Sequence, residues 1–261
     1  MYMRGSEERM LVLVMLALFA VGAIAGLVDA IAGGGGLLTV PSLWLLAPGL
    51  DAQQLLGTNK GQGVFGTATS LHRFANSPLL DRRRARASFP PALIGAALGV
   101  LLVSRIQPDV LRPVVMILLA MAAVLVIIQR PPHVQLESRP RPAWMAAIVG
   151  FGLAGYDGFF GPGTGTFLIL ACTYLWRDPL DAASANAKVV NFASNLASMA
   201  TFAMLGLIVW QYALPMAAGQ IIGGYAGAHL TIRVGRNLVR YVVVAVSLGL
   251  IAWLAWQMIY G

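Results

Sequence analysis

Charged side chains are scarce in this chain. Lys, Arg, Asp and Glu together make up 11% of its 261 residues, whereas 58% are hydrophobic. A soluble domain carries about 25% charged residues, so this composition excludes an ordinary soluble globular protein. The mean hydropathy of +0.76 supports the same conclusion. We therefore predict an all-α polytopic membrane protein without a separate soluble domain.

Cysteine and histidine are also sparse, which limits the chemistry open to the chain. The single cysteine, Cys172, excludes an internal disulfide framework and a cysteine-based metal site. The three histidines, His72, His133 and His229, lack the spacing of metal ligands. The sequence contains no nucleophile–base pair and no HExxH motif, so we expect no enzyme activity, no metal and no cofactor.

The net charge of +8 comes from arginines, most of which lie in short connections between apolar segments. Cytoplasmic loops of membrane proteins carry such an excess, so topology explains these arginines better than nucleic-acid binding does. We expect the lipid bilayer, and no nucleic acid, as a partner. The apolar run 10–25 resembles a signal peptide but lacks a net-positive leader, and we expect a retained membrane span.

Glycine is concentrated where a membrane helix tolerates it least. The stretch VDAIAGGGG, residues 28–36, places one carboxylate and four consecutive glycines inside an apolar run. Each glycine costs ~1 kcal/mol relative to Ala in a helix interior, so we predict a helix that stops and restarts as a short second helix. The stretch YDGFFGPGTG, residues 156–165, repeats this construction 128 positions later. Two interrupted segments at matching places are the best sequence indication of a transporter's binding site.

The apolar segments form two matching sets of five. The first set is expected at Met10–Ile31, Leu37–Leu46, Ala52–Phe74, Ala87–Val103 and Val110–Ile128. The second set is expected at Ala143–Tyr156, Thr166–Leu175, Leu180–Leu207, Tyr212–Ile232 and Leu238–Ile259. The halves align without a gap, so that Lys60 falls on Lys188 and Ser70 on Ser198. We predict a first membrane repeat over 1–130, a cytoplasmic linker over 131–142 and a second membrane repeat over 143–261, within one transport domain.

Two repeats with an odd number of elements must lie inverted in the membrane. If the N-terminus is outside, 12 arginines lie on the inner side and 4 on the outer side. A parallel arrangement would move Arg233, Arg236 and Arg240 outside, against the positive-inside rule. We therefore predict two inverted five-element repeats with interrupted, re-entrant helices, and both termini in the periplasm.

The only two lysines, Lys60 and Lys188, lie within apolar segments at the same repeat position. A cation at the centre of a membrane helix costs at least ~2.5 kcal/mol, so such residues are functional candidates by default. Asp29 and Asp157 fit three roles: counter-ions of the lysines, partners for the backbone of the broken helices, or proton carriers. A structural ion pair at rest is compatible with a lysine that exchanges its carboxylate for a substrate anion.

Further polar residues share one face with the lysines. Asn191, Asn195 and Ser198 follow Lys188 at helical spacing, and Thr67 is the first-half equivalent of Asn195. Substrate binding and interhelical hydrogen bonding are open alternatives for Asn195 and Thr67. Gln220, which lies among glycines, is a further candidate lining residue. Asp51 and Asp178 are each expected to be the N-cap of a helix, and Pro179 is expected at the first helical position after Asp178.

The glycine runs open the short helices, where exposed N–H groups and the positive end of the helix dipole favour an anion. The amides expected at the ligand belong to Gly34, Gly35, Gly36, Gly163, Thr164 and Gly165. Glycines in the fourth segment of each half fit close helix crossing instead. These packing glycines are Gly95, Gly99, Gly223 and Gly227.

The motifs VDAIAGGGGLLTVPSL, LGTNKGQ, GYDGFFGPGTGTF and ANAKVVNFASN resemble those of the TauE/SafE sulfite exporter family, and most closely its subgroup of "probable membrane transporter" proteins. The resemblance covers nearly the whole chain. It implies a multi-pass permease of the bacterial inner membrane, in a family linked to sulfite, sulfoacetate and other organosulfur anions. The family motifs carry over onto Asp29, Gly33 to Gly36, Thr58, Asn59, Lys60, Asp157, Gly161 to Gly165, Asn186, Lys188, Asn191 and Asn195.

These observations together predict a secondary transporter for a small anion such as sulfite or an organosulfonate. The lysines would supply charge, and the glycine amides with the Asn, Thr and Ser side chains would supply hydrogen bonds. The alternative is an anion channel with the same lining. The expected partners are a small anionic substrate and the bilayer, and a homodimer is a further expectation.

Overall fold

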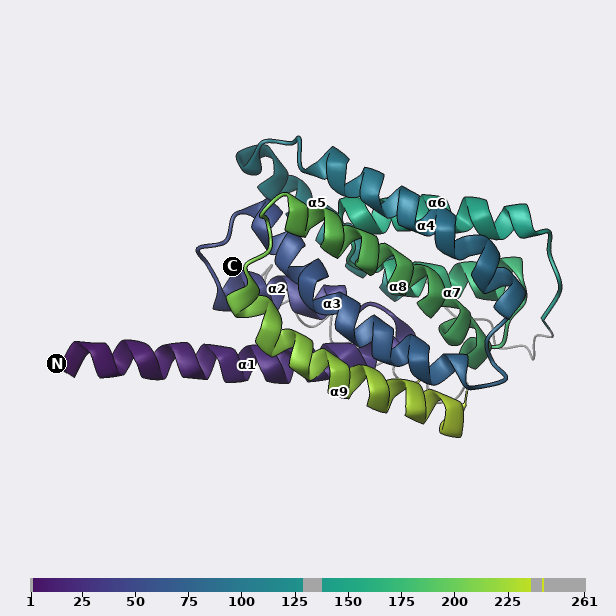
Figure 1. Ribbon diagram of the computed structural model, residues 1–261, viewed down its shortest axis with the longest axis horizontal. Helices are drawn as coiled ribbons and strands as arrows, with labels where there is room; N and C mark the ends of the chain where they lie inside the picture. The colour runs from purple at the N-terminus through teal and green to yellow at the C-terminus, as the bar shows by residue number, and fades with distance from the viewer. Residues whose placement is uncertain (1, 129–137, 236–240, 242–261) are drawn as a thin grey trace.

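The computed structural model describes residues 2–128, 138–235 and 241 (Figure 1). Within this part of the chain the secondary structure is helical throughout, without strands. The helices of the first half are α1 (Tyr2–Ala32), α2 (Gly36–Leu46), α3 (Ala52–Ala75), α4 (Arg82–Val103) and α5 (Pro108–Ile128). Those of the second half are α6 (Ala143–Phe159), α7 (Thr164–Leu175), α8 (Leu180–Met204) and α9 (Trp210–Val234). The prediction of an all-α protein is thus confirmed for these residues.

The helix breaks fall at the glycine-containing motifs. α1 ends at Ala32 and α2 begins at Gly36, while α6 ends at Phe159 and α7 begins at Thr164. The connections contain glycines with positive φ: 73° at Gly33, 82° at Gly34, 97° at Gly161 and 85° at Gly163. Residues with a Cβ rarely adopt this conformation, so glycine is strongly favoured at these two breaks.

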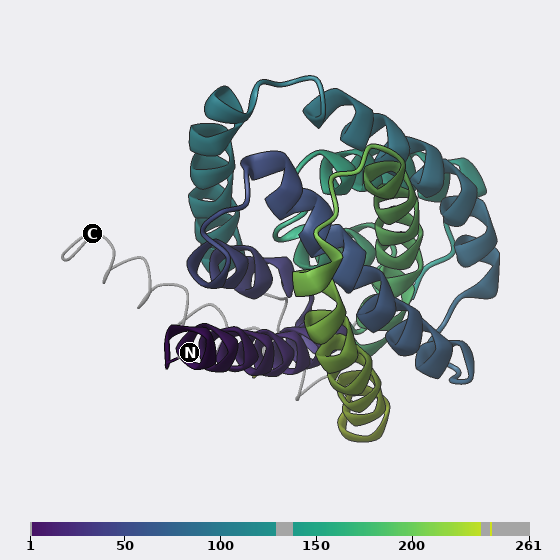
Figure 2. The same ribbon diagram turned by 60° about the vertical axis from the view of Figure 1, so that its left-hand side comes forward.

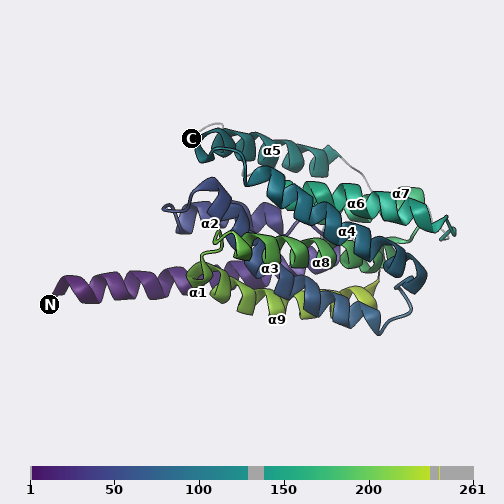
Figure 3. The ribbon, with the colours of Figure 1, turned by 45° about the horizontal axis from the view of Figure 1, so that its top comes forward.

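The helices are arranged around α3 and α8, which lie side by side in the middle (Figure 3). α4 and α6 pack on one side of this central pair, and α1 and α9 pack on the other. Figure 1 shows α3 and α9 running from its left side to its right, whereas α4, α6 and α8 run the opposite way. The first turns of α1 project beyond the other helices in Figure 1, and Figure 2 shows this helix foreshortened, with its N-terminal end toward the viewer.

Arginines gather at one end of the molecule. This arginine end comprises the α3–α4 connection, residues 138–142, the α7–α8 connection and the last turn of α9, on the right in Figure 1. Two hydrogen bonds there join residues 138–142 to the end of α7: the Arg139 amide donates to Trp176 O at 2.7 Å, and Arg141 Nε donates to Leu175 O at 3.0 Å. The opposite end comprises the α2–α3, α4–α5 and α8–α9 connections. The described arginines of the arginine end are Arg73, Arg82, Arg83, Arg84, Arg86, Arg139, Arg141, Arg177 and Arg233.

The polarity of the described residues is opposite to that of a soluble protein. Large apolar side chains are exposed on the outer helices, among them Leu98 on α4, Ile117 on α5, Ile148 on α6 and Ile222 on α9. Both lysines are buried. By length and composition, Glu8–Ala32 and Arg82–Val103 could cross a membrane, with hydropathies of 2.9 and 1.6. An apolar exterior around a polar interior supports a multi-pass membrane protein.

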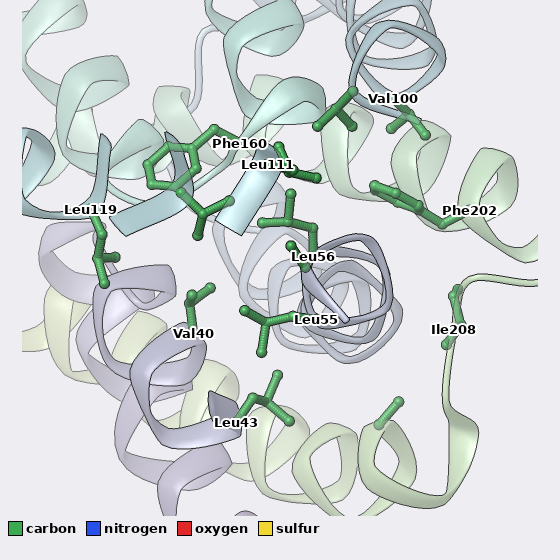
Figure 4. Packing of buried hydrophobic residues seen from close by; sticks show 14 of the residues in the cluster. Val40, Leu43, Leu55, Leu56, Val100, Leu111, Leu119, Phe160, Phe202 and Ile208 are labelled. Carbon is green, nitrogen blue, oxygen red and sulfur yellow. The ribbon is translucent and has the colours of Figure 1, made fainter. Parts of the chain in front are cut away.

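Apolar packing fills the space between the cavity region and the opposite end. Figure 4 shows Val40 and Leu43 of α2 facing Leu55 and Leu56 of α3, with Ile208 nearby. At Gly95 and Gly99 of α4, a Cβ would collide with the backbone of α6, and at Gly223 and Gly227 a Cβ would collide with α1. The prediction that these glycines allow close helix crossing is confirmed.

The helix boundaries differ from the sequence prediction at some ends. α4 begins five residues early, at Arg82, because Asp81 caps it by accepting from the amides of Arg83 and Arg84 at 3.0 Å each. Asp51 is an N-cap as predicted, and Gln54 completes a capping box. The prediction for Asp178 is wrong: Pro179 is the N-cap of α8, and the Asp178 carboxylate binds an arginine instead. Apart from residue 241, the predicted segment Leu238–Ile259 lies outside the described residues.

Candidate functional site

A small polar cavity lies where the two helix breaks meet the central pair α3 and α8. It is lined from both halves, and its volume is about 40 Å³. One water needs roughly 10–15 Å³ by this measure, so the cavity holds about three water-sized groups. The lining residues are Asp29, Gly34, Gly35, Gly36, Thr39, Asn59, Lys60, Gln62, Gly63, Thr67, Asp157, Gly161, Gly163, Gly165, Asn191, Asn195 and Gln220.

Two buried ion pairs cross between the halves at this cavity. Lys188 Nζ of α8 lies 2.6 Å from Asp29 Oδ2 of α1, and Lys60 Nζ of α3 lies 2.8 Å from Asp157 Oδ1 of α6. The side chains are 1% and 16% exposed in the first pair and 3% exposed on each side in the second. Each half thus supplies the cation for the other half's broken helix. The four charges sum to zero.

The asparagines of α8 join the two ion pairs into one network. Lys60 Nζ donates to Asn195 Oδ1 at 3.3 Å, and Asn195 Nδ2 donates to Asn191 Oδ1 at 3.0 Å. Asn191 Nδ2 in turn donates to Asp29 Oδ2 at 3.3 Å. Hydrogen bonds therefore connect Lys60, through the two asparagines, to Asp29, which is the partner of Lys188.

The aspartates have second partners that hold them in place. Asp29 Oδ1 accepts from the Gly35 amide at 3.2 Å, so this carboxylate also serves the backbone of the broken helix. Asp157 Oδ2 accepts from Ser194 Oγ at 2.5 Å. Both carboxylates are therefore counter-ions of lysines, and Asp29 fills the second predicted role as well.

Glycine at the breaks lets the two halves touch. A Cβ at Gly33 would collide with the backbone of Gly165 and Thr166. A Cβ at Gly161 would lie 2.9 Å from Lys60 Nζ. The glycines thus keep α1, α2, α6 and α7 close enough for the lysines to reach the opposite carboxylates.

Most of the predicted site residues line the cavity, but four do not: Thr58, Thr164, Asn186 and Lys188. Thr58 Oγ1 accepts from the Val209 amide at 3.1 Å, near the opposite end. Thr164 Oγ1 donates to Gly161 O at 2.7 Å and so closes the first turn of α7. Asn186 lies at the arginine end. Lys188 does not line the cavity, but its ammonium group donates to the carboxylate of Asp29, which does.

Two polar side chains of the cavity were not predicted from the sequence. Thr39 Oγ1 donates to Asn59 Oδ1 at 2.5 Å, and Gln62 Nε2 donates to the same oxygen at 3.0 Å. Neither residue has a polar equivalent in the second half, so a search for duplicated residues passes over both. The sequence does place Asn59 and Gln62 three residues apart, and this spacing could have predicted that both lie on the same face of a buried helix.

A second hollow opens at the arginine end. Its lining includes Asp81, Arg84, Asp178, Asp181 and Asn186. Asp178 is fully buried and accepts from Arg84 Nη1 at 2.6 Å and from Nη2 at 3.1 Å. Asn186 Nδ2 donates to Asp178 Oδ2 at 3.2 Å, and Asn186 Oδ1 accepts from the Asp81 amide at 2.8 Å. These contacts tie the α3–α4 connection to the start of α8.

Comparison with known proteins gives consistent matches over most of the chain. The family described as "Sulfite exporter TauE/SafE" matches residues 18–254. A "Probable membrane transporter protein" of Haemophilus influenzae is 38% identical over 232 residues, which is 88% of this chain and 90% of that protein. "Probable membrane transporter protein YfcA" of Escherichia coli K12 is 34% identical over 238 residues, covering 90% of this chain and 87% of the relative.

A more distant relative, "Probable membrane transporter protein YunE" of Bacillus subtilis, is 27% identical over 236 residues, 81% of this chain and 86% of its own. No solved structure matches the chain.

Proposed function

The chain belongs to the sulfite exporter TauE/SafE family, and from this premise we propose that it is a secondary transporter for a small oxyanion or organosulfonate. The observation that carries the proposal is the pair of crossed Lys–Asp contacts beside one polar cavity. Ionisable side chains inside a membrane protein are costly, and they mark functional sites such as the pathways of substrates, ions and protons. We propose that the anion takes the place of a carboxylate at a lysine.

The exchange of an aspartate for a substrate anion at a lysine fits the energetics of the site. Breaking a buried ion pair by removing one partner costs about 3–5 kcal/mol, because the remaining charge is left without compensation. An incoming anion offsets this cost when its oxygens accept from the released ammonium group. Because the pairs join different halves, each exchange also loosens a contact between the halves. Binding is thereby linked to relative motion of the halves.

We further propose that the halves are inverted repeats. Contacts between helices occur in equivalent pairs, among them α1 with α9 and α6 with α4, α1 with α2 and α6 with α7, and α2 with α3 and α7 with α8. The α1 and α6 helices run in opposite directions, as do α3 and α8 (Figure 1). In this proposal α2 and α7 are re-entrant, and rocking of one half against the other gives alternating access.

The distribution of arginine supports an orientation in the membrane. We propose that the arginine end faces the cytoplasm and that the protein lies in a bacterial inner membrane with its N-terminus in the periplasm. The inverted arrangement would place the C-terminus, which lies outside the described residues, on the same side.

The test is flux in proteoliposomes with sulfite, sulfoacetate and taurine, each measured with and without a proton gradient. We expect saturable flux and counter-flow of at least one anion, and a loss of about tenfold or more in Lys60→Gln and Lys188→Gln. Arg105→Gln is the matched control, because it removes an exposed cation outside the cavity. Unchanged flux of every accepted anion in both lysine variants would contradict the proposal, and ohmic single-channel current would favour a channel instead.

A further inference from the structure

The cavity wall differs between its two sides. From the first half, Thr39, Asn59 and Gln62 contribute polar side chains. The residues 128 positions later are apolar: Phe167, Ala187 and Val190. Ala187 and Val190 belong to an apolar cluster between α8 and its neighbours, away from the cavity. The second half thus forms the corresponding helices with apolar residues at these three positions. The polar side chains of Thr39, Asn59 and Gln62 therefore point to a role in ligand recognition.

Gln62 has one polar atom without a partner. Its Nε2 donates to Asn59 Oδ1 at 3.0 Å, which fixes the orientation of the amide. Its Oε1 is buried and accepts no hydrogen bond from any described residue. Gln62 as a whole is 2% exposed. An unsatisfied buried acceptor is destabilising, and a ligand in the cavity that donates to this oxygen would remove that cost.

The charge balance at the cavity limits the charge that a ligand can carry. Two ammonium groups and two carboxylates already balance each other there. Each further negative charge is placed in a neutral, poorly solvated site, so the cost of entry rises steeply from a monoanion to a dianion. The volume of about 40 Å³ also favours a compact ion.

We infer that the cavity selects a monoanion that carries its own hydrogen-bond donor, an O–H or N–H group, and that Gln62 Oε1 accepts from this donor. This inference rests on the proposed function and narrows its substrate class. The anion's oxygens face Lys60, the lysine that lines the cavity, and its donor faces the wall formed by Asn59 and Gln62. A fully deprotonated dianion, or a monoanion that ends in a methyl group, leaves the Gln62 acceptor unsatisfied.

The test uses two anions of equal charge and nearly equal shape, sulfamate and methanesulfonate, which differ by NH₂ against CH₃. Binding to the purified full chain in detergent is measured by thermal stabilisation and by competition with an anion that is transported. We expect sulfamate to bind at least about tenfold more tightly, because a site built to hydrogen-bond a group rejects the analogue that lacks it. We expect Gln62→Met, which keeps the volume and removes the acceptor, to abolish this preference.

Two further variants keep the outcome interpretable. Gln211→Met, at an exposed glutamine in the first turn of α9, should retain the full preference. Gln62→Glu keeps an acceptor and adds a charge, so it should keep the preference while weakening both anions. Equal binding of the two anions by the native chain, or a preference that survives Gln62→Met, would overturn the inference while leaving anion transport intact. Failure of every anion to bind and to move would overturn the proposed function, and this inference with it.

Discussion

The charged residues of the cavity are held by one another rather than by solvent. Lys188 and Asp29 are 1% and 16% exposed, so water screens their attraction little. Removing one partner leaves a buried charge, whereas removing both leaves neutral groups of similar size. The stability of the protein should therefore depend on the pair more than on either residue.

This dependence gives a prediction for stability. We expect Lys188→Gln and Asp29→Asn each to lower the unfolding free energy by about 3 kcal/mol. The double variant should lose less than the sum of the two, and its melting temperature in detergent should exceed that of either single variant. Strictly additive losses would show that the two side chains do not interact.

At the scale of residues, sequence reasoning found the charges but not their pairing. Lys60 and Lys188 stand out because lysine occurs nowhere else in the chain. Which aspartate each lysine meets depends on how the halves pack, and periodicity carries no information about that. The contact between Arg84 and Asp178 was missed for the same reason: the residues are 94 positions apart, and an aspartate before proline equally fits a helix cap.

The helix breaks illustrate how much of an element is set locally. The glycine run predicted the end of α1 and the start of α2, because glycine both disfavours helix and permits positive φ. It could not predict that Gly33 would lie against Gly165 of the other half. Sequence therefore predicted the elements and their breaks, whereas the contacts between breaks emerge only in the assembled fold.

Gly33 should accordingly tolerate no side chain. Gly33→Ala forces a residue with φ of 73° to carry a Cβ that collides with the α7 backbone. We expect a loss of at least about 2 kcal/mol from backbone strain and displaced contacts, together with loss of flux. Gly152→Ala is the control, since a Cβ there meets nothing within 4 Å. Its melting temperature should stay the same or rise, because alanine favours the helix.

The contact of Arg84 with Asp178 should hold the arginine end closed. Ala182 lies in the adjoining hollow, so a cysteine placed there in a Cys172→Ala background reports access. We expect Arg84→Gln to raise the labelling rate about tenfold or more, since ~1.4 kcal/mol lost from the closed state multiplies the open population by ten. Arg82→Gln, which removes an exposed neighbouring arginine, should leave the rate unchanged. An unaltered rate in Arg84→Gln would exclude a closing role for this contact.

For the whole molecule, the single cysteine makes the orientation testable. Cys172 is buried, and its removal leaves a background for introduced thiols. Asn76→Cys lies at the arginine end and Gln107→Cys at the opposite end, both at exposed positions. We expect a membrane-impermeant reagent to label Gln107→Cys in intact cells and Asn76→Cys only after the membrane is opened. The reverse pattern would place the arginine end in the periplasm.

The crossed lysine contacts also fix an order of assembly. Asp29 is synthesised long before Lys188, and Lys60 long before Asp157, because each pair joins residues from different halves of the chain. When only the first half of the chain has been synthesised, Asp29 and Lys60 are present, but their partners Lys188 and Asp157 are not. The central contacts can therefore close only late in biogenesis, once α8 has entered the bilayer beside the helices that preceded it.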